Sequence, residues 1–236
     1  RTQFGIAVFW ILNGLIKKML IGDYIAVNFI DRVFGDPMRH TGFENIMALY
    51  GYSLQVYADF SGYTDIAIGV ALLMGFTLPM NFNSPYKARN VGEFWKRWHI
   101  SLSTWLRDYL YVPMGGNRSG SLFSWIMLGV IGAALVLLTG LLWLPVVFLS
   151  LFALSIVLVR ISPGAEKFIT TNLNLMITML IGGLWHGASW MFVIWGGLNG
   201  LGLVVYKQWK RISPWEGSKK WYAHLWMVFS TFSFIT

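Results

Sequence analysis

The sequence contains no cysteine and has few charged side chains. Without cysteine among its 236 residues, the chain has no disulfide bond, no thiol catalysis and no cysteine-ligated metal. Only 12% of its residues are Asp, Glu, Lys or Arg, whereas a soluble globular domain carries about 25%. With a mean hydropathy of +0.58, this composition predicts an integral membrane protein rather than a soluble protein with a large core.

Well-known catalytic motifs are also missing. There is no P-loop, no Gly-x-Ser-x-Gly, no His-Glu-x-x-His and no Cys/His cluster, which argues against nucleotide hydrolysis and metal catalysis. The chain has no signal-peptide pattern, begins at Arg1 and stops inside an apolar segment, so we interpret it as a fragment of a longer chain. The chemistry that remains is histidine-based proton or acyl transfer.

The net charge of +8 follows the pattern of a membrane protein and not of a nucleic-acid-binding protein. The basic residues gather in two clusters between apolar segments, at residues 87–118 and 207–220. Such clusters are typical of cytoplasmic loops under the positive-inside rule. We therefore expect both clusters to be cytoplasmic, in a chain surrounded by membrane lipid.

Two long segments, residues 119–159 and 168–206, carry no Asp, Glu, Lys or Arg. About 20 residues cross a bilayer as a helix, so residues 119–159 are long enough to cross twice, as a hairpin that turns near Leu144-Pro145. Residues 2–16 are also apolar and end at Lys17-Lys18, consistent with a truncated span that meets the cytoplasmic face.

Residues 45–76 are mostly apolar but contain Asp59 and Asp65 around Ser61 and Gly62. This pattern predicts two spans or half-spans with a polar, glycine-containing break between them. Carboxylates inside membrane segments are typical of proton or ion pathways. The alternative is that the two aspartates are paired at the helix break.

Residues 93–112 predict an amphipathic helix that is too polar to cross lipid alone, so we expect it at the interface or inside the protein. His99 falls on the flank of its apolar stripe, where a lone histidine is more often structural than catalytic. The stripe consists of Phe94, Trp98, Leu102, Trp105, Tyr109 and Val112.

His186 is the only histidine or charged residue in residues 168–206, and glycines lie on both sides of it. An imidazole inside a bilayer must be desolvated or must find partners, so it is rarely accidental. Counted along a helix from Leu173, His186 lies about 20 Å in, near the bilayer centre. It is either bonded to a neighbouring carbonyl or a general base with Trp185 and Trp190 as dry walls.

The remaining polar features are weaker. Gly115-Gly116-Asn117-Arg118 is either a phosphate-binding loop of backbone amides and an arginine or a plain turn. Arg107-Asp108 is most simply a local ion pair, or pairs with Arg97. His40 and His224 are assigned no role. The candidate substrate-binding residues are Trp98, Arg107, Asp108, Asn117, Arg118 and Trp185.

At these residues the chain resembles the membrane-bound O-acyltransferase (MBOAT) family, in the bacterial branch that acetylates extracellular polysaccharides such as alginate, cellulose or peptidoglycan. Four ordered motifs of this length are a specific signal. They are YADFSGYTDIA at 57–67, NFNSPY at 81–86, EFWKRWHISLS at 93–103 with its continuation to GGNR at 115–118, and GLWHGASW at 183–190.

The resemblance implies a central tunnel, with His186 as the principal catalytic histidine and His99 as a second histidine facing it. It also implies an acyl donor, acetyl-CoA, that reaches the tunnel from the cytoplasm, and no tightly bound cofactor. Transfer would run toward the outer face of a bacterial inner membrane. In alginate-type systems a separate extracytoplasmic acyltransferase passes the acetyl group to the sugar, so we expect such a partner protein.

One departure from the family pattern is the length of chain between the GGNR loop and the WHG motif. Residues 121–168 intervene there and look like two added spans. We therefore predict an all-α integral membrane protein, a multi-span helical bundle with half-spans and an interfacial amphipathic helix around a central tunnel. It would form one membrane domain over residues 1–236, with an inserted two-span hairpin at about 121–168.

The leading functional hypothesis is a membrane O-acyltransferase in which His186 is the general base and His99 positions the acceptor or polarises the carbonyl. A rival from another class is a proton- or ion-coupled transporter that uses His186 with Asp59 and Asp65. The absence of an inverted repeat of broken spans argues against it. A third possibility is a non-catalytic scaffold for the extracytoplasmic partner.

Overall fold

The computed structural model describes residues 2–118, 120–140 and 143–236, which are helical with no strand among them. The chain divides into two compact units, which are described separately. Unit 1 consists of Arg1–Ser101 and Gly217–Thr236, and unit 2 of Leu102–Glu216. The all-helical prediction is confirmed within the described residues.

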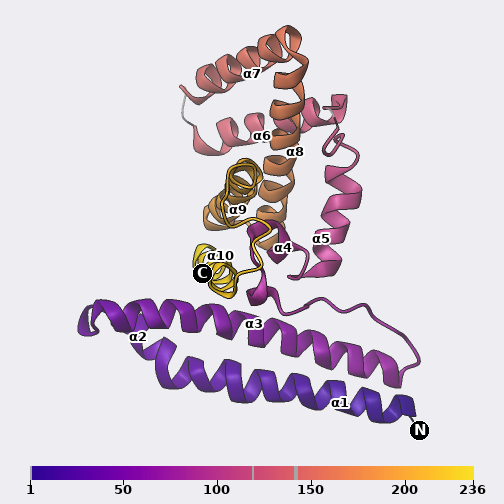
Figure 1. Cartoon of the computed structure of the whole chain (residues 1–236), viewed down its shortest axis with the longest axis vertical. Coiled ribbons are helices and arrows are strands. Elements are labelled where there is room, and N and C mark those ends of the chain that lie inside the picture. The colour runs from indigo at the N-terminus through magenta and orange to yellow at the C-terminus, as the bar shows by residue number, and fades with distance from the viewer. Residues whose placement is uncertain (1, 119, 141–142) are drawn as a thin grey trace. The chain divides into compact units, whose positions relative to one another are not determined.

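Unit 1 is built on an antiparallel pair of long helices, α1 and α3 (Figure 1). A capping box starts α3: the Thr41 side chain accepts from the Glu44 amide, and the Glu44 carboxylate accepts from the Thr41 amide. The elements of this unit are α1 (Thr2–Ile16), the π-helical η1 (Lys17–Asp23) and η2 (Ala26–Ile30), α2 (Asp31–Gly35), η3 (Pro37–Arg39), α3 (Gly42–Leu73), η4 (Pro85–Lys87), α4 (Val91–Trp95) and α10 (Trp221–Ile235).

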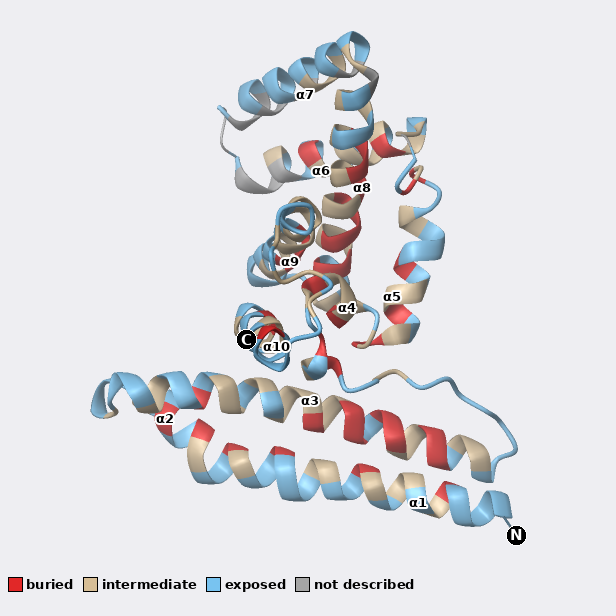
Figure 2. Ribbon diagram, viewed as in Figure 1, coloured by how far each residue is buried: buried red, intermediate tan, exposed pale blue. Residues whose placement is uncertain are grey.

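Glycines bring α1 and α3 into backbone contact. A Cβ added at Gly62 would lie 2.7 Å from the Gly14 carbonyl oxygen, and one added at Gly69 would lie 2.6 Å from the Ala7 carbonyl oxygen. Figure 2 shows buried residues along the faces that these helices turn to each other. Small residues at such contacts are typical of helix pairs in membranes, where close packing replaces the hydrophobic effect as the source of association.

The structure corrects the predicted break in residues 45–76. Helix α3 is continuous from Gly42 to Leu73 and carries Asp59 and Asp65 in its interior. The two carboxylates bind the ammonium groups of Lys18 and Lys17 at 3.0 Å and 2.6 Å. Because η1 supplies both partners, no break is needed to solvate or pair the aspartates.

The predicted helix over 93–112 is also wrong as one element. It is divided into α4, α5 (Ile100–Leu106) and the π-helical η5 (Arg107–Tyr111), with a turn at 96–99 between α4 and α5. The boundary between the two units falls inside α5. The first half of the predicted apolar stripe is buried, whereas Trp105, Tyr109 and Val112 are exposed.

Unit 2 contains η5 and four longer helices, of which α8 and α9 form an antiparallel hairpin (Figure 1). A Cβ added at Gly196 would collide with the Met179 carbonyl oxygen, and one added at Gly183 would collide with the Phe192 carbonyl oxygen. This hairpin is therefore joined by glycine contacts like those of α1 and α3. The helices are α6 (Leu122–Thr139), α7 (Leu144–Ile161), α8 (Pro163–His186) and α9 (Trp190–Trp209).

Helices α6 and α7 occupy the segment interpreted as an inserted pair of spans. Helix α6 ends at Gly140, which has a φ of +64°, and Leu144-Pro145 begins α7 rather than forming the turn. Residues 141–142 lie outside the described residues. That this pair is an insertion, and that it crosses the membrane twice, stays a prediction.

Two helical stretches among the described residues are long and apolar enough to cross a membrane, Thr2–Gly35 and Gly164–His186. The second ends at His186, because α8 begins at Pro163 and stops at that residue. His186 is therefore the last residue of this stretch, followed by a short turn to α9. That it lies near the bilayer centre stays a prediction.

Candidate functional site

Aromatic side chains from α3, α4 and the chain before α4 form the core of unit 1. Phe94 and Trp98 are buried at the centre of this core, with their rings stacked at 5.5 Å between centroids. Phe82 contacts Trp98 edge-on at 5.0 Å. Partly buried residues packed around the core include Tyr57, Phe60 and Tyr86. The core fixes the backbone on which His99 lies.

Residues 81–83 hold the turn that carries His99. The Asn83 amide donates to the Arg97 carbonyl at 2.9 Å, and the Arg97 guanidinium donates back to the Asn83 carbonyl at 3.1 Å. The Asn81 backbone oxygen accepts from the Ile100 amide at 3.0 Å, and its side-chain oxygen accepts from the Ser101 amide at 2.9 Å. We call these four bonds the 81–83 clamp. They join two motifs that the sequence presents separately.

His99 itself is buried and has a left-handed backbone. It is 7% exposed, its φ is +44°, and its ring meets Phe60 edge-on at 4.7 Å between centroids. A non-glycine residue in this conformation costs about 1–3 kcal/mol and persists only where the surroundings enforce it. The clamp on one side and Phe60 on the other supply that enforcement. The positive φ also explains why one helix cannot run through this point.

An ion pair fastens the same turn to α4. Burial by itself would raise the pKa of Glu93, but the Arg89 amide and the Arg97 guanidinium bind its carboxylate and lower the pKa below the ordinary 4.5. The closest of these contacts joins Arg97 Nη2 to Glu93 Oε1 at 2.7 Å. Arg97 therefore connects α4, the turn and the 81–83 clamp.

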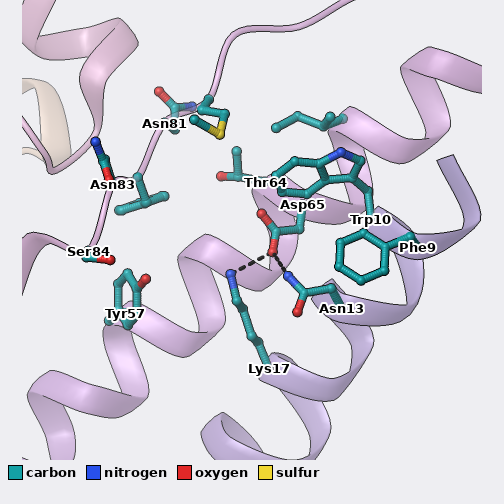
Figure 3. Close-up of a pocket in the computed structure, with 13 residues that line it drawn as sticks. Phe9, Trp10, Asn13, Lys17, Tyr57, Thr64, Asp65, Asn81, Asn83 and Ser84 are labelled. Atoms are coloured by element: carbon teal, nitrogen blue, oxygen red, sulfur yellow. Dashed lines mark hydrogen bonds and ion pairs between the residues drawn. The ribbon is translucent and has the colours of Figure 1, made fainter. Parts of the chain in front are cut away.

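A cavity of about 270 Å³ lies in unit 1 between α1, α3 and the loop at residues 80–84 (Figure 3). At its wall, Asp65 Oδ2 accepts from Lys17 Nζ and from Asn13 Nδ2, both at 2.6 Å. The rim includes Asn81 and Asn83 of the clamp. The same loop therefore touches the cavity on one side and the His99 turn on the other.

In unit 2, His186 ends α8 at the turn to α9. Its Nδ1 lies 2.7 Å from the Gly182 carbonyl oxygen, and its ring is half-buried against Trp185, Phe192 and Trp195. A carbonyl oxygen only accepts, so Nδ1 carries the proton and Nε2 keeps its lone pair in the neutral ring.

The aromatic neighbours of His186 differ in part from those expected. Trp185 meets the imidazole edge-on at 5.1 Å, whereas Trp190 begins α9 and is 46% exposed. Phe192 and Trp195, two and five residues further along α9, take its place at the ring. The turn permits this because a Cβ at Gly187 would lie only 2.7 Å from the Phe192 ring.

The Gly115-Gly116-Asn117-Arg118 loop has the geometry of a turn. The amides of Gly115, Gly116 and Arg118 each donate to a carbonyl within residues 111–115, so they do not form a ready cradle for a phosphate. Asn117 and Arg118 are exposed. Burial raises the pKa of Tyr111 to about 12, so its protonated hydroxyl donates to Asn117 Oδ1 at 2.9 Å.

Asn174 of α8 fixes this loop from behind. It is fully buried, and its Nδ2 donates to the Met114 carbonyl at 2.9 Å and to the Gly116 carbonyl at 3.3 Å. Gly116 has a φ of +57°, which favours glycine at that position. The loop is thus held against the helix that ends at His186.

Arg107 and Asp108 form the predicted local ion pair. Arg107 donates to both carboxylate oxygens, at 2.7 Å and 3.1 Å, and this contact lowers the pKa of Asp108 and raises that of Arg107. Both residues are exposed. Of the two candidate tryptophans, Trp98 is buried in the core of unit 1 and Trp185 is 58% exposed.

The predicted site residues fall into both units. His99 and Trp98 belong to unit 1, whereas His186, Trp185, Asn117 and the other candidates belong to unit 2. That the two histidines face each other across a tunnel stays a prediction. Within the described residues, no group of three or more His, Cys, Asp or Glu side chains is arranged to hold a metal ion.

Two polar features escaped the sequence reasoning: the clamp formed by Asn81 and the pairing of Asp65 with Lys17. The signal for the clamp was present in the NFNSPY motif, whose asparagines have no role in a plain loop. The signal for the ion pairs was the spacing of two lysines at the end of one apolar helix and two aspartates inside the next.

The described residues form a helical protein with two stretches that are long and apolar enough to cross a membrane. The chain belongs to MBOAT, the membrane-bound O-acyltransferase family, whose model matches residues 2–173. It is 39% identical over 196 residues to the probable alginate O-acetylase AlgI of Pseudomonas fluorescens, covering 83% of this chain and 30% of that protein.

Two further relatives carry related names. The chain is 37% identical over 207 residues to the peptidoglycan O-acetyltransferase of Helicobacter pylori, covering 88% of this chain and 30% of the relative. It is 27% identical over 229 residues to the teichoic acid D-alanyltransferase of Bacillus subtilis, covering 95% and 47%. The chain thus spans about 30% of the length of the O-acetylating relatives.

Proposed function

We propose that this chain is part of a multi-pass O-acyltransferase of the bacterial inner membrane. It would move an acetyl group from a cytoplasmic donor, acetyl-CoA, toward the outer face for O-acetylation of an extracytoplasmic polysaccharide. A partner acyltransferase outside the membrane would receive the group and complete the transfer. The observation that carries this proposal is membership of the family together with relatives named for O-acetylation of alginate and peptidoglycan.

The environment of His186 supports a role as general base. With Nδ1–H donated to the Gly182 carbonyl, the ring is held in one tautomer and Nε2 is the free base. In the reaction, Nε2 takes the proton of the acceptor hydroxyl while the hydroxyl oxygen attacks the thioester carbonyl carbon. The carbon–sulfur bond then breaks, and the departing thiolate takes the proton from the imidazolium. An ester and a free thiol result.

The setting of His99 supports an auxiliary role. A buried histidine on a strained, clamped turn keeps its position when substrate arrives, which suits a group that orients an acceptor or donates a hydrogen bond to a polarised carbonyl. Its backbone is fixed by Asn81 and its ring by Phe60.

The alternative function, a transporter that uses His186 with Asp59 and Asp65, has less support than acyl transfer. Asp59 and Asp65 are occupied by Lys18 and Lys17 at 3.0 Å and 2.6 Å, so their charges are neutralised within a helix pair. A proton relay needs carboxylates that exchange partners, and these ion pairs do not favour such an exchange.

The test compares His186→Ala with His224→Ala in membranes that contain the complete protein and its partner. Acetyl transfer from radiolabelled acetyl-CoA to polymer or partner is measured. Loss of a general base lowers the rate by about 10²–10⁴-fold, so His186→Ala should fall by that factor. His224→Ala, a histidine with no assigned role, should keep wild-type activity. Wild-type transfer by His186→Ala would disprove the base assignment.

A further inference from the structure

The cavity of unit 1 has the construction of a ligand site. Its volume of about 270 Å³ is near the lower end of small-molecule pockets, which begin at about 300 Å³. Thr64, Asp65 and Ile68 of α3 at its floor are buried, whereas Asn83 and Ser84 at its rim are exposed. A ligand of the size of one ring would reach the floor from this rim.

The charges at the cavity cancel. Lys17 and Asp65 are the charged residues of its lining, and they bind each other at 2.6 Å. An anion entering the cavity would be repelled by the Asp65 carboxylate, and a cation would be repelled by the Lys17 ammonium group, which is already bound to Asp65. Desolvating either ion would not be offset, so the cavity selects an uncharged ligand.

Hydrogen-bonding groups remain available within this neutral wall. All the hydrogen bonds of Asp65 within the described part of the chain go to Oδ2, and Figure 3 shows its other oxygen directed away from Lys17 and Asn13. That oxygen is an acceptor for a hydroxyl proton. The side-chain oxygen of Asn81 is used by Ser101, which leaves its NH₂ group as a donor on the rim.

Aromatic rings supply the rest of the lining. Phe9, Trp10, Tyr57 and Phe82 lie around the polar groups, from α1, α3 and the loop. Flat aromatic faces beside planar amides and a carboxylate suit a ligand with apolar C–H faces and a rim of hydroxyl groups.

Two residues with a strained backbone lie on the cavity lining or on the turn beside it. Ser84 and His99 are the non-glycine residues with positive φ in the described chain, at +46° and +44°. Ser84 lies on the cavity rim, and His99 lies on the turn that the same loop clamps. Strained residues gather at ligand clamps, because a rigid surface binds without reordering.

We propose that this cavity binds an uncharged sugar ring, with the free oxygen of Asp65 accepting a ring hydroxyl and Trp10 or Tyr57 covering a ring face. The site is formed by residues of unit 1 alone, and its occupation by a sugar does not require acyl transfer. Its failure and the failure of the proposed function are therefore distinguishable, since sugar binding is measured without any acyl donor.

The experiment uses the full chain in phosphatidylcholine nanodiscs, which avoid sugar-headed detergents. Saturation-transfer NMR titrations compare mannose with its charged analogues mannuronate and mannosamine. Mannose should bind saturably and about tenfold more tightly than either charged analogue, the factor for one poorly compensated charge.

Variants test the role of Asp65. Asp65→Asn should weaken mannose binding about tenfold and turn the preference toward mannuronate, because Lys17 then carries an uncompensated charge. The control Asp59→Asn breaks the neighbouring ion pair to Lys18, which lies outside the cavity lining, and should change nothing. The double variant Lys17→Met with Asp65→Asn should weaken mannose binding without any gain for mannuronate.

Circular dichroism and size exclusion establish that each variant is folded. If Asp65→Asn fails to fold, the neutral double variant decides alone, and wild-type mannose affinity in it overturns the proposal. The proposal is also overturned if mannose does not saturate the wild-type chain, or if Asp59→Asn weakens mannose as much as Asp65→Asn does. Tighter binding of mannuronate than of mannose by the wild-type chain has the same consequence.

Discussion

Replacing Asn81 by alanine should lower acyl transfer more than it lowers stability. The substitution removes the side-chain oxygen that accepts from the Ser101 amide at 2.9 Å, while the backbone bond to Ile100 stays. The Ser101 amide lies in the first turn of α5, directly after His99. Asn81 accepts two of the four hydrogen bonds of the 81–83 clamp, and the substitution removes one of these two. The clamp that holds the left-handed turn at His99 is therefore weakened.

The magnitude follows from two opposing energies. Loss of a side-chain acceptor at a helix start costs about 0.5–2 kcal/mol. The conformation of His99, at a φ of +44°, stores about 1–3 kcal/mol of strain. Because these energies are comparable, losing the acceptor lets the turn relax and moves the imidazole. A displacement of about 1 Å lowers a rate by about 100-fold, whereas about 1 kcal/mol shifts the Tm by only about 2–4 °C.

The assay measures acetyl transfer and Tm for Asn81→Ala, Asn81→Asp and His99→Ala. Aspartate also presents an acceptor oxygen to the Ser101 amide, so Asn81→Asp should recover most of the transfer. The reasoning is refuted if Asn81→Ala keeps full transfer while His99→Ala loses it, or if Asn81→Asp is as poor as Asn81→Ala. Full transfer by His99→Ala would instead remove the proposed role of that histidine.

Three further predictions concern the support of the fold. Gly62→Ala should destabilise the chain by about 1–3 kcal/mol in thermal unfolding, because its Cβ would lie 2.7 Å from the Gly14 carbonyl; Gly5→Ala, with open space around it, is the neutral control. Glu93→Gln should lower the Tm at pH 7, and its difference from wild type should vanish as pH falls below 4.5 through the lowered folded pKa; a constant difference contradicts this. Asn174→Leu should leave the Gly116 carbonyl without its donor, while the Met114 carbonyl keeps the Ser124 hydroxyl and the Ser121 amide, at a cost of about 1–3 kcal/mol, with faster hydrogen exchange at residues 113–118; unchanged exchange there would show that the loop does not depend on Asn174.

The helices were predictable from the sequence because their signals are local. Apolar runs of span length, and the lack of charge in them, predicted α1, α6 and α7, and marked residues 168–206 as membrane-like without showing the break between α8 and α9. The breaks were less predictable, because they depend on partners distant in the chain. The apolar residues over 93–112 keep a helical spacing throughout. The helix is nevertheless interrupted just before Ile100 and Ser101, whose amides donate to Asn81.

The reverse error occurred in α3. Two aspartates with serine and glycine between them have the local signature of a break, and only Lys17 and Lys18 from the preceding helix make the continuous helix possible. Ion pairing across a helix pair has no short-range signature. Gly62 allows the backbone of α1 to pack closely against α3 and does not form a turn. A sequence does not distinguish between these two uses of glycine.

The sequence was sufficient to identify candidate residues by their chemical type, but not to predict their hydrogen bonds or their place within a helix. His186 was identified from its isolation in an apolar run, but the contact of its Nδ1 with the Gly182 carbonyl at 2.7 Å, one helical turn back, could not be identified in this way. Its position at the end of a helix could not be counted from the sequence, because the helix start at Pro163 and the stop at His186 are set by Ser162 and by the turn at Gly187.

The two helix hairpins solve the same physical problem in the same way. Each must hold a polar group in a mostly apolar segment, and each brings backbones together through glycine: Gly14 with Gly62 in one, Gly183 with Gly196 in the other. Close approach of the backbones leaves little room for lipid beside the polar group, so its hydrogen-bond partners come from the hairpin itself. In the first hairpin the group is Asp65, bound to Lys17 from the facing helix. In the second it is His186, whose Nδ1 contacts a carbonyl of its own helix and whose ring is covered by a ring from the facing helix.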